Sequence, residues 1–407
     1  MISKNEKLIV KKIFEACMLD RPVLESLAPF SASGLVTDVI RKTDAKVFDK
    51  GVSDFLKTNT GSDLSQETFL RVIRSTQILC KDLDDCSIEE KLSKFTELFK
   101  ACKVKAHSTL KTLHGADASC LLQPLKIGAI TIYAMPRHAD QIESLFESCG
   151  HNFKGGTTKV VVEHRSMVRD QIKALEIANK AFNTLDLLIA FLLGEKNKTS
   201  AAGVMRLSFV PFQQAIVTSA SGFFGGEEKS FGFKENVNIF DLLSSEPCQG
   251  VGLPLELIST VLNPVDEIGR KISRAVEWIG EAYIEENKAS AFVKVSVAME
   301  VLLKVDEKGV ISSSIMATMA EQCAFLLGKD VAACIGIEGK VKRLYGVRSS
   351  IVHSGTGSVE DSVLQEFLDF IRLVIFKVFD LKVTLNLKRI EELQETLKMR
   401  KYSGVSE

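Results

Sequence analysis

Apolar positions recur at the three- and four-residue spacing of amphipathic helices through the first 115 residues of the chain. Three such stripes run from Leu8 to Cys17, from Phe69 to Leu79 and from Leu92 to Phe99. The last stripe follows Ser87, with Glu90 three residues later, which is the arrangement of an N-terminal capping box. No strand-like segment is found here. The pattern predicts a helical N-terminal region, which we place at residues 1–120.

The pattern changes after about residue 120, where β-branched residues gather in short runs between helical stripes. Together these segments predict an α+β region at residues 121–250. The glycine-rich run 221–226 reads as a turn; it follows no βα unit and therefore does not match a phosphate-binding loop. The expected strands are 127–133, 160–162, 205–211 and 214–219, and the expected helices are 139–149 and 167–193.

From about residue 251 the spacing is helical throughout, and five stripes in about 130 residues predict an all-α bundle at 251–407. Asn263 before Pro264 predicts the start of one helix, Ser312–Ser314 the start of another, and Ser358 with Asp361 the cap of the fifth. A fourth helix is expected from Gly339 to about His353. The polar tail after Lys398 is expected to fray.

The fifth helix of this bundle is apolar on nearly all sides. The bundle therefore has more apolar surface than five short helices can bury among themselves. We expect this helix to lie in the bundle centre or in a dimer interface. Its large apolar residues are Phe367, Phe370, Ile371, Val374, Ile375 and Phe379. The fold class predicted for the whole chain is mainly α: a helical N-terminal region, an α+β middle region and a C-terminal all-α bundle.

Composition and charge narrow the functional classes. The chain has 52 Lys and Arg against 52 Asp and Glu, so its net charge of zero excludes a protein coated in basic residues for polyanions, but not a local basic patch. With 45% hydrophobic residues the chain is too apolar to be disordered. The N-terminus lacks an apolar signal core, and the most apolar run, 187–193, is about a third of a bilayer span. We expect a cytoplasmic protein with no membrane segment.

Metal and cofactor chemistry find no support in the residue pattern. The nine cysteines are scattered with no C-x-x-C, which excludes zinc knuckles and thioredoxin-like pairs. Several lie in apolar stretches, as buried reduced thiols do. The six histidines show no pair at metal-ligand spacing on one helix face. We therefore expect no metal and no cofactor.

One histidine stands out, because His353 is the only one in the helical C-terminal region. It closes the run Leu344-Tyr-Gly-Val-Arg348-Ser-Ser-Ile-Val-His353-Ser-Gly355. This R-x-x-x-x-H at the end of a bundle helix resembles the mark of HEPN domains, and L-Y-x-x-R-S-x-I-V-H-x-G resembles the Apea-like HEPN branch. Ala298 to Leu303 resembles that branch's A-x-E-x-L-L helix, and Ala320 to Gly328 sits where its third helix should. The similarity covers roughly residues 260–382, about a third of the chain. Many HEPN proteins have Asn, Asp or His directly after the arginine, whereas this chain has Ser349. A serine at this position matches the Apea-like sequence motif.

The residue types suit RNA cleavage without a metal. A histidine transfers protons near neutral pH, and the fork of an arginine matches phosphate oxygens. Five residues on a continuous helix amount to about 140° of rotation, so Arg348 and His353 share a face only if the helix ends or bends between them. Gly355 and Gly357 make such an end reasonable. One histidine per chain supplies one proton-transfer group; HEPN relatives dimerise so that two motifs meet in one cleft, and the resemblance implies the same here.

Charged neighbours complete the predicted site. Glu300 interrupts an apolar run, so its carboxylate needs a partner, and Arg348 is the obvious one. Four basic residues and no acidic one lie between Gly339 and Arg348, which predicts a local anion-attracting patch. We assign Lys340, Lys342, Arg343 and Ser349 to RNA binding. The alternatives are a solvated basic face for Lys340, Lys342 and Arg343, and a purely structural Glu300–Arg348 pair with His353 at a helix end. For Tyr345 we expect packing rather than base stacking.

The predicted function is a metal-independent endoribonuclease of HEPN type that acts as a homodimer on RNA. The resemblance implies a role in antiviral (antiphage) defence or toxin-like RNA cleavage, with residues 1–250 sensing a protein or phage-derived trigger. His353 would be the general acid or base, Arg348 the phosphate binder, and Glu300 the residue that orients Arg348. The alternative is a non-catalytic HEPN scaffold that dimerises and binds RNA or a nucleotide.

Overall fold

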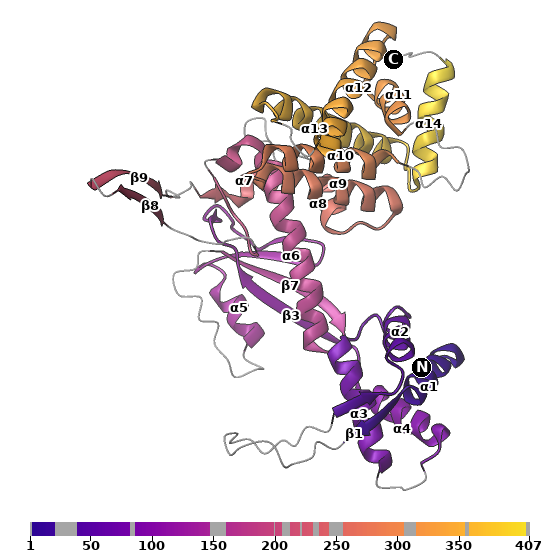
Figure 1. Cartoon of the computed structure of the whole chain (residues 1–407). Coiled ribbons are helices and arrows are strands. Elements are labelled where there is room, and N and C mark those ends of the chain that lie inside the picture. The colour runs from indigo at the N-terminus through magenta and orange to yellow at the C-terminus, as the bar shows by residue number, and fades with distance from the viewer. Residues whose placement is uncertain are drawn as a thin grey trace. The chain divides into compact units, whose positions relative to one another are not determined.

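The computed structural model describes residues 2–20, 39–81, 86–146, 160–198, 200–205, 212–219, 222–230, 236–243, 255–304, 315–354 and 358–403. It is mainly helical, at 68% helix, with a small sheet in the middle region and an all-helical C-terminal region, which confirms the predicted fold class. The chain forms two compact units (Figure 1). Unit 1 contains residues 1–109 and 164–179, and unit 2 contains residues 110–163 and 180–407. The predicted boundaries near residues 120 and 250 stay predictions.

Unit 1 is a small helical unit around a core of phenylalanine rings. Phe55 stacks on Phe69 with ring centroids 4.5 Å apart, and Phe95 meets both rings edge-on. The capping box predicted at Ser87 and Glu90 is present. The elements that lie wholly within it are α1 (Lys4–Glu15), β1 (Cys17–Asp20), β2 (Val39–Lys42), α2 (Ala45–Leu56), α3 (Gln66–Lys81) and α4 (Ile88–Ala101).

Strands in the first 120 residues are a correction to the sequence analysis, which expected none. Strands β1 and β2 pair antiparallel over four residues each, and β3 (Lys105–Thr112) follows α4. Strands of four residues are too short to show an alternating pattern, and Cys17 was assigned to the helical stripe before it. Leu8, Ile78 and Leu79, also placed in apolar stripes, are exposed.

The middle of the chain forms a four-stranded sheet with strand order β3-β7-β6-β5. The expected strand 127–133 is a hairpin instead: β5 and β6 pair antiparallel across Gly128, whose φ of 60° is easily adopted by glycine. The elements are β4 (Ala116–Asp117), β5 (Leu125–Ile127), β6 (Ile130–Ala134), α5 (Ala139–Phe146), β7 (Val160–Val168), α6 (Gln171–Leu193), the 3₁₀ helix η2 (Gly194–Lys198), β10 (Val237–Asn238) and α7 (Ile239–Leu243).

A second hairpin pairs β8 (Phe212–Ser219) with β9 (Gly222–Ser230). The predicted strand 214–219 is therefore confirmed. The turn predicted at 221–226 is wrong from Gly222 onward, because Gly225 and Gly226 pair in the ladder with Val217 and Ile216. Glycine weakens a strand without preventing one. The predicted strand 205–211 lies outside the described residues from 206 onward.

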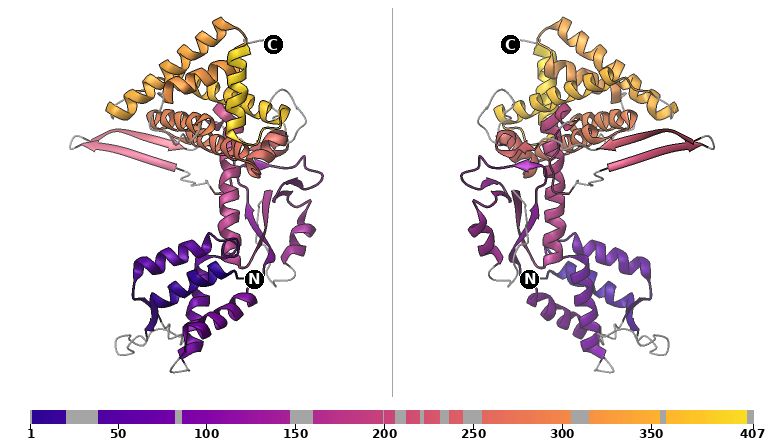
Figure 2. Two further views of the ribbon diagram at one scale, coloured as in Figure 1. Left: turned by 90° about the vertical axis from the view of Figure 1, so that its right-hand side faces the viewer. Right: turned by 90° about the vertical axis from the view of Figure 1, so that its left-hand side faces the viewer.

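The C-terminal region is a helical bundle (Figures 1 and 2). It has two helices more than predicted among the described residues, α8 and α14. Lys401 of α14 pairs with Glu321 at 2.9 Å, so this helix does not fray at Lys398. The helices are α8 (Leu255–Leu262), α9 (Glu267–Ile284), α10 (Lys288–Leu303), α11 (Ile315–Leu327), α12 (Val331–Ser354), α13 (Asp361–Thr384) and α14 (Ile390–Ser403).

Three predicted helix starts in the bundle need correction. Helix α9 is capped by Asp266, whose carboxylate accepts the Gly269 N–H at 2.7 Å, rather than by Asn263. Glu360 precedes α13 without a side-chain cap, so the Ser358–Asp361 cap is absent. Helix α12 begins at Val331, eight residues before the predicted start. The start predicted at 312–314 lies outside the described residues.

The apolar helix α13 lies in the centre of the bundle, one of the two predicted locations. Phe367, Ile371, Val374 and Ile375 have no exposed surface within a single chain. The C-terminal half of α6 completes this core: a Cβ on Gly280 of α9 would lie 2.2 Å from the Leu187 carbonyl oxygen. Part of the cover of α13 comes from outside the five predicted helices, in line with the expectation that those five do not bury it alone: Phe191 of α6 packs against Phe376 of α13, with ring centroids 6.0 Å apart.

One described helix, Gln171–Asn197, is long and apolar enough to cross a membrane by length and composition alone. Its mean hydropathy is 1.3, and 67% of this window is buried inside the protein. The core helix of a soluble protein meets the same criteria. The packing of α6 against α9 described above gives it such a core position.

Candidate functional site

Helices α10 and α12 bring three of the polar side chains of unit 2 together. Glu300, in the last turn of α10, accepts a hydrogen bond at Oε1 from the Tyr345 hydroxyl of α12. The same oxygen accepts a long hydrogen bond of 3.5 Å from Nη2 of Arg348, one turn further along α12. The Arg348 guanidinium lies 5.6 Å from the centroid of the Tyr345 ring. The Glu300–Arg348 pair predicted from the sequence is therefore present, and Tyr345 is its third member.

This Glu300–Tyr345–Arg348 cluster is partly withdrawn from water. The side chains of Arg348 and Glu300 are 28% and 24% exposed. Burial, and then the carboxylate of Glu300, raises the pKa of the Tyr345 hydroxyl far above its usual range, so it stays a proton donor. Among the described residues, Nε of Arg348 is buried and has no hydrogen-bond partner. An unsatisfied buried donor is costly.

His353 lies on a different side of the same helix. Helix α12 runs without interruption from Val331 to Ser354, so the predicted end or bend between Arg348 and His353 is absent. The five intervening residues turn the helix by about 140°, which separates the two side chains around its axis. His353 is exposed in the last turn. Gly355 and Gly357, from which the earlier end was predicted, lie outside the described residues.

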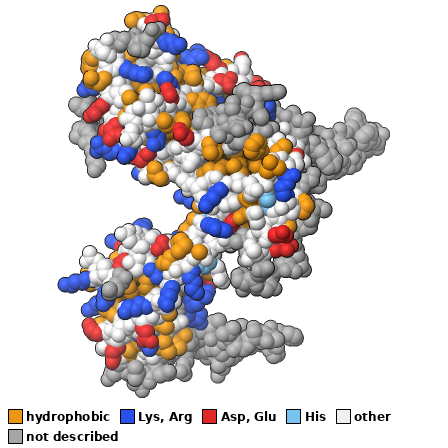
Figure 3. Space-filling view, turned by 180° about the vertical axis from the view of Figure 1, so that it is seen from behind, with side chains coloured by type: hydrophobic (Ala, Val, Ile, Leu, Met, Phe, Trp, Pro, Cys, Tyr) orange, Lys and Arg blue, Asp and Glu red, His pale blue; other side chains and the backbone are white. Residues whose placement is uncertain are grey.

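The predicted basic patch is largely neutralised. Nη2 of Arg343 donates to both carboxylate oxygens of Glu366 of α13, at 2.6 and 2.5 Å, and Nζ of Lys340 lies 3.2 Å from Oε1 of the same carboxylate. Lys342 pairs with Glu338, four residues earlier on α12. Over the bundle as seen from behind, acidic and basic side chains are interspersed (Figure 3). No acidic residue occurs in the sequence between residues 339 and 348, but Glu338 and Glu366 lie next to these basic side chains in the fold. The predicted patch without acidic neighbours is therefore wrong.

The remaining predicted residue, Ser349, is half-buried on α12 next to Arg348. No group of three or more metal-ligating side chains occurs among the described residues. All seven described cysteines are free thiols, and Cys17, Cys80, Cys323 and Cys334 are buried. Cys149 and Cys248 lie outside the described residues.

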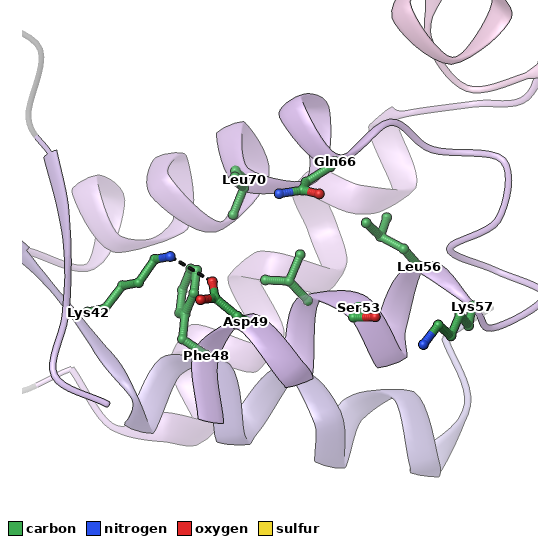
Figure 4. Close-up of a pocket in the computed structure, with 9 residues that line it drawn as sticks. Lys42, Phe48, Asp49, Ser53, Leu56, Lys57, Gln66 and Leu70 are labelled. Carbon is green, nitrogen blue, oxygen red and sulfur yellow. Dashed lines mark hydrogen bonds and ion pairs between the residues drawn. The ribbon is translucent and has the colours of Figure 1, made fainter. Parts of the chain in front are cut away.

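A hollow of about 400 Å³ lies in unit 1 between β2, α2 and α3 (Figure 4). Its apolar floor is bordered by the Lys42–Asp49 ion pair, with 2.6 Å between Nζ and Oδ1. None of the site residues predicted in α10 and α12 lines it. The lining consists of Lys42, Phe48, Asp49, Val52, Ser53, Leu56, Lys57, Gln66 and Leu70.

Chemically, the cluster in unit 2 offers a guanidinium held by a carboxylate and a phenol, with one buried donor left over. Such a group can bind a phosphate oxygen, and the exposed His353 can exchange protons, but the two do not converge within one chain. The sequence analysis missed the hydrogen-bonding role of Tyr345. Its signal was the spacing, since residues three apart share a helix face and Tyr345 therefore had to face Glu300 with Arg348.

The comparisons with protein-family models, curated proteins and solved structures return no match for this chain.

Proposed function

We propose that this protein is a metal-independent endoribonuclease whose reacting groups are Arg348 and His353. The observation that carries the proposal is the Arg348 guanidinium, which is 28% exposed and makes one long hydrogen bond in a cluster built by Glu300 and Tyr345. A phosphate oxygen satisfies such a donor with a charge-assisted hydrogen bond. The resemblance of Arg348-Ser-Ser-Ile-Val-His353 to the HEPN motif supports the same chemistry.

The roles follow from the chemistry of each group. Arg348 binds the scissile phosphate and stabilises the charge that develops on it, and Glu300 orients Arg348. His353 takes the proton from the RNA 2′-hydroxyl or gives one to the leaving 5′-oxygen. Because the two side chains point about 140° apart on α12, one chain does not hold both against a single phosphate. The site is therefore completed by a second copy, with Arg348 from one chain and His353 from the other.

RNA binding by Lys340, Lys342, Arg343 and Ser349 is part of the same proposal. In the free protein the three basic side chains pair with Glu366 and Glu338. These pairs are 32–49% exposed, and exposed ion pairs contribute little stability. RNA phosphates can therefore compete for these basic side chains at low salt, and the affinity should fall as salt rises.

The test is incubation of the purified protein with total RNA in EDTA. We expect cleavage with 2′,3′-cyclic phosphate ends, because attack by the 2′-hydroxyl needs no metal. His353→Ala and Arg348→Ala should each lower the rate by about two orders of magnitude or more. His107→Ala on β3 is the matched histidine control and should cleave like the wild type. Cleavage that requires Mg²⁺ and leaves 5′-phosphates would overturn the mechanism.

A second candidate is a non-catalytic HEPN scaffold that binds RNA or a nucleotide and dimerises. The observation in its favour is the uninterrupted α12, which keeps Arg348 and His353 on different sides of the helix. Under this reading RNA binds but is not cut, and His353→Ala changes nothing. Either function is consistent with a cytoplasmic role in defence, with residues 1–250 receiving the trigger, which the family resemblance suggests.

A further inference from the structure

A single oxygen of Glu300 serves two donors. Oε1 accepts from the Tyr345 hydroxyl in a very short contact, and from Nη2 of Arg348 at 3.5 Å. Among the described residues no hydrogen bond is recorded for the other oxygen, Oε2. The carboxylate is therefore hydrogen-bonded to the tyrosine and makes one long contact with the arginine.

The distance of 3.5 Å between Nη2 of Arg348 and Oε1 of Glu300 is long for an arginine beside a carboxylate. Such pairs are frequently bidentate, with two parallel hydrogen bonds of about 2.7–2.9 Å. Arg343, on the same helix as Arg348, donates from Nη2 to both carboxylate oxygens of Glu366 of α13, at 2.6 and 2.5 Å. Among the residues that the structure describes, Arg348 instead makes one long contact with Glu300, and its buried Nε has no partner.

We propose that Tyr345 is a positioning residue, whose hydroxyl occupies Glu300 and so keeps Arg348 from closing into a bidentate pair. The phenol shares the negative charge of the carboxylate, and its ring lies beneath the guanidinium, 5.6 Å from centroid to Cζ. Arg348 is thereby held in place with its donors available to an RNA phosphate. RNA as the ligand rests on the proposed function. The effect of Tyr345 on the Glu300–Arg348 interaction is independent of that function.

A packing role for Tyr345, as the sequence suggested, makes a different prediction. If only the ring matters, removal of the hydroxyl changes neither the Glu300–Arg348 interaction nor the binding of RNA. Tyr345→Phe keeps the ring and removes the hydroxyl, so it separates the two roles.

The first experiment needs no RNA. A double-mutant cycle of Glu300→Gln and Arg348→Ala gives the interaction free energy between the two side chains from chemical unfolding. It is measured once with Tyr345 and once in the Tyr345→Phe background. We expect the coupling to increase about twofold or more in the phenylalanine background, because Arg348 can then pair with both carboxylate oxygens. Equal coupling in the two backgrounds would overturn the positioning role, whatever the protein binds.

The second experiment measures binding of a fluorescent single-stranded RNA on the His353→Ala background, which prevents cleavage. Tyr345→Phe should raise the Kd about tenfold, and Tyr345→Phe with Glu300→Gln should restore it, since the competing charge is gone. Tyr402→Phe, at a position 73% exposed, is the control. Weakened binding that Glu300→Gln does not restore would contradict the proposal. Absence of RNA binding by every variant would refute the proposed function and leave the first experiment to decide on Tyr345.

Discussion

Glu300 and His353 differ in burial, although both belong to the proposed site: the Glu300 side chain is 24% exposed, whereas His353 is exposed. Glu300 accepts from Tyr345 and Arg348 in a half-buried cluster. Removing its carboxylate leaves a hydroxyl and a guanidinium short of an acceptor, so Glu300→Ala should cost roughly 1–3 kcal/mol of stability as well as activity. His353 is exposed, so His353→Ala should stay within about 0.5 kcal/mol. Chemical unfolding of both variants measures the difference. A large loss of stability in His353→Ala, with cleavage retained, would make His353 structural.

Glu6 shows how a single carboxylate links the stability of unit 1 to pH. Its burial raises the pKa, but hydrogen bonds from the Ser3 N–H and from the hydroxyls of Thr60, Thr58 and Ser3 outweigh this and lower it from 4.5 to about 2. The stabilisation is complete above the unfolded value near 4.5 and is lost as the pH falls toward 2.

Substitution of Glu6 tests this sign. Glu6→Gln should lower the urea midpoint of unfolding at pH 7, and the gap to the wild type should narrow at pH 3. Glu15→Gln, at an exposed position in the same helix, is the control and should leave the midpoint unchanged at both pH values. A gap that widens on acidification would contradict the assignment.

At the scale of elements, helices were predicted from the sequence where a long apolar pattern at helical spacing followed directly after a capping residue. The capping box at Ser87 and Glu90 is the clearest case. Helix α12 was predicted eight residues too short, because Gly336 and Gly339 are poor helix formers. Asp330 accepts the Ala333 N–H at 2.7 Å, and the buried Cys334 follows, so packing and a cap carry the helix through both glycines.

The start of α9 provides a test of element capping. Asp266 accepts the Gly269 N–H at 2.7 Å and pairs with Lys382 of α13 at 2.6 Å, with both side chains under 20% exposed. Asp266→Ala removes a cap worth about 1 kcal/mol and leaves a partly buried lysine unpaired. We expect a loss of about 1–3 kcal/mol in chemical unfolding. Asn263→Ala, the cap expected from the sequence, should cost less than half as much; the reverse order would restore Asn263 as the cap.

At the scale of the molecule, a contact between distant residues could be predicted only where the sequence showed that a charge in an apolar run needed a partner. Glu300 and Arg348 could be paired because a charge inside an apolar helix demands a partner. Glu366 could not be foreseen as the partner of Arg343, because side chains that are 32% and 49% exposed do not require a partner. Likewise, the cover that α6 provides for the bundle joins residues about 90 apart in the chain, as in the Thr184–Glu277 hydrogen bond. No local pattern encodes such contacts.

The composite site predicts complementation between inactive variants. Arg348→Ala and His353→Ala each inactivate both sites of their own homodimer. When the two proteins are mixed and allowed to exchange subunits, half of the dimers are mixed, and each mixed dimer has one site with Arg348 from one chain and His353 from the other. We expect about a quarter of the wild-type cleavage rate to return, provided that both reacting groups act as proposed. Light scattering should show dimers at micromolar concentration. A mixture that forms dimers but stays inactive would mean that Arg348 and His353 must come from the same chain, which requires α12 to unwind before His353 when RNA binds.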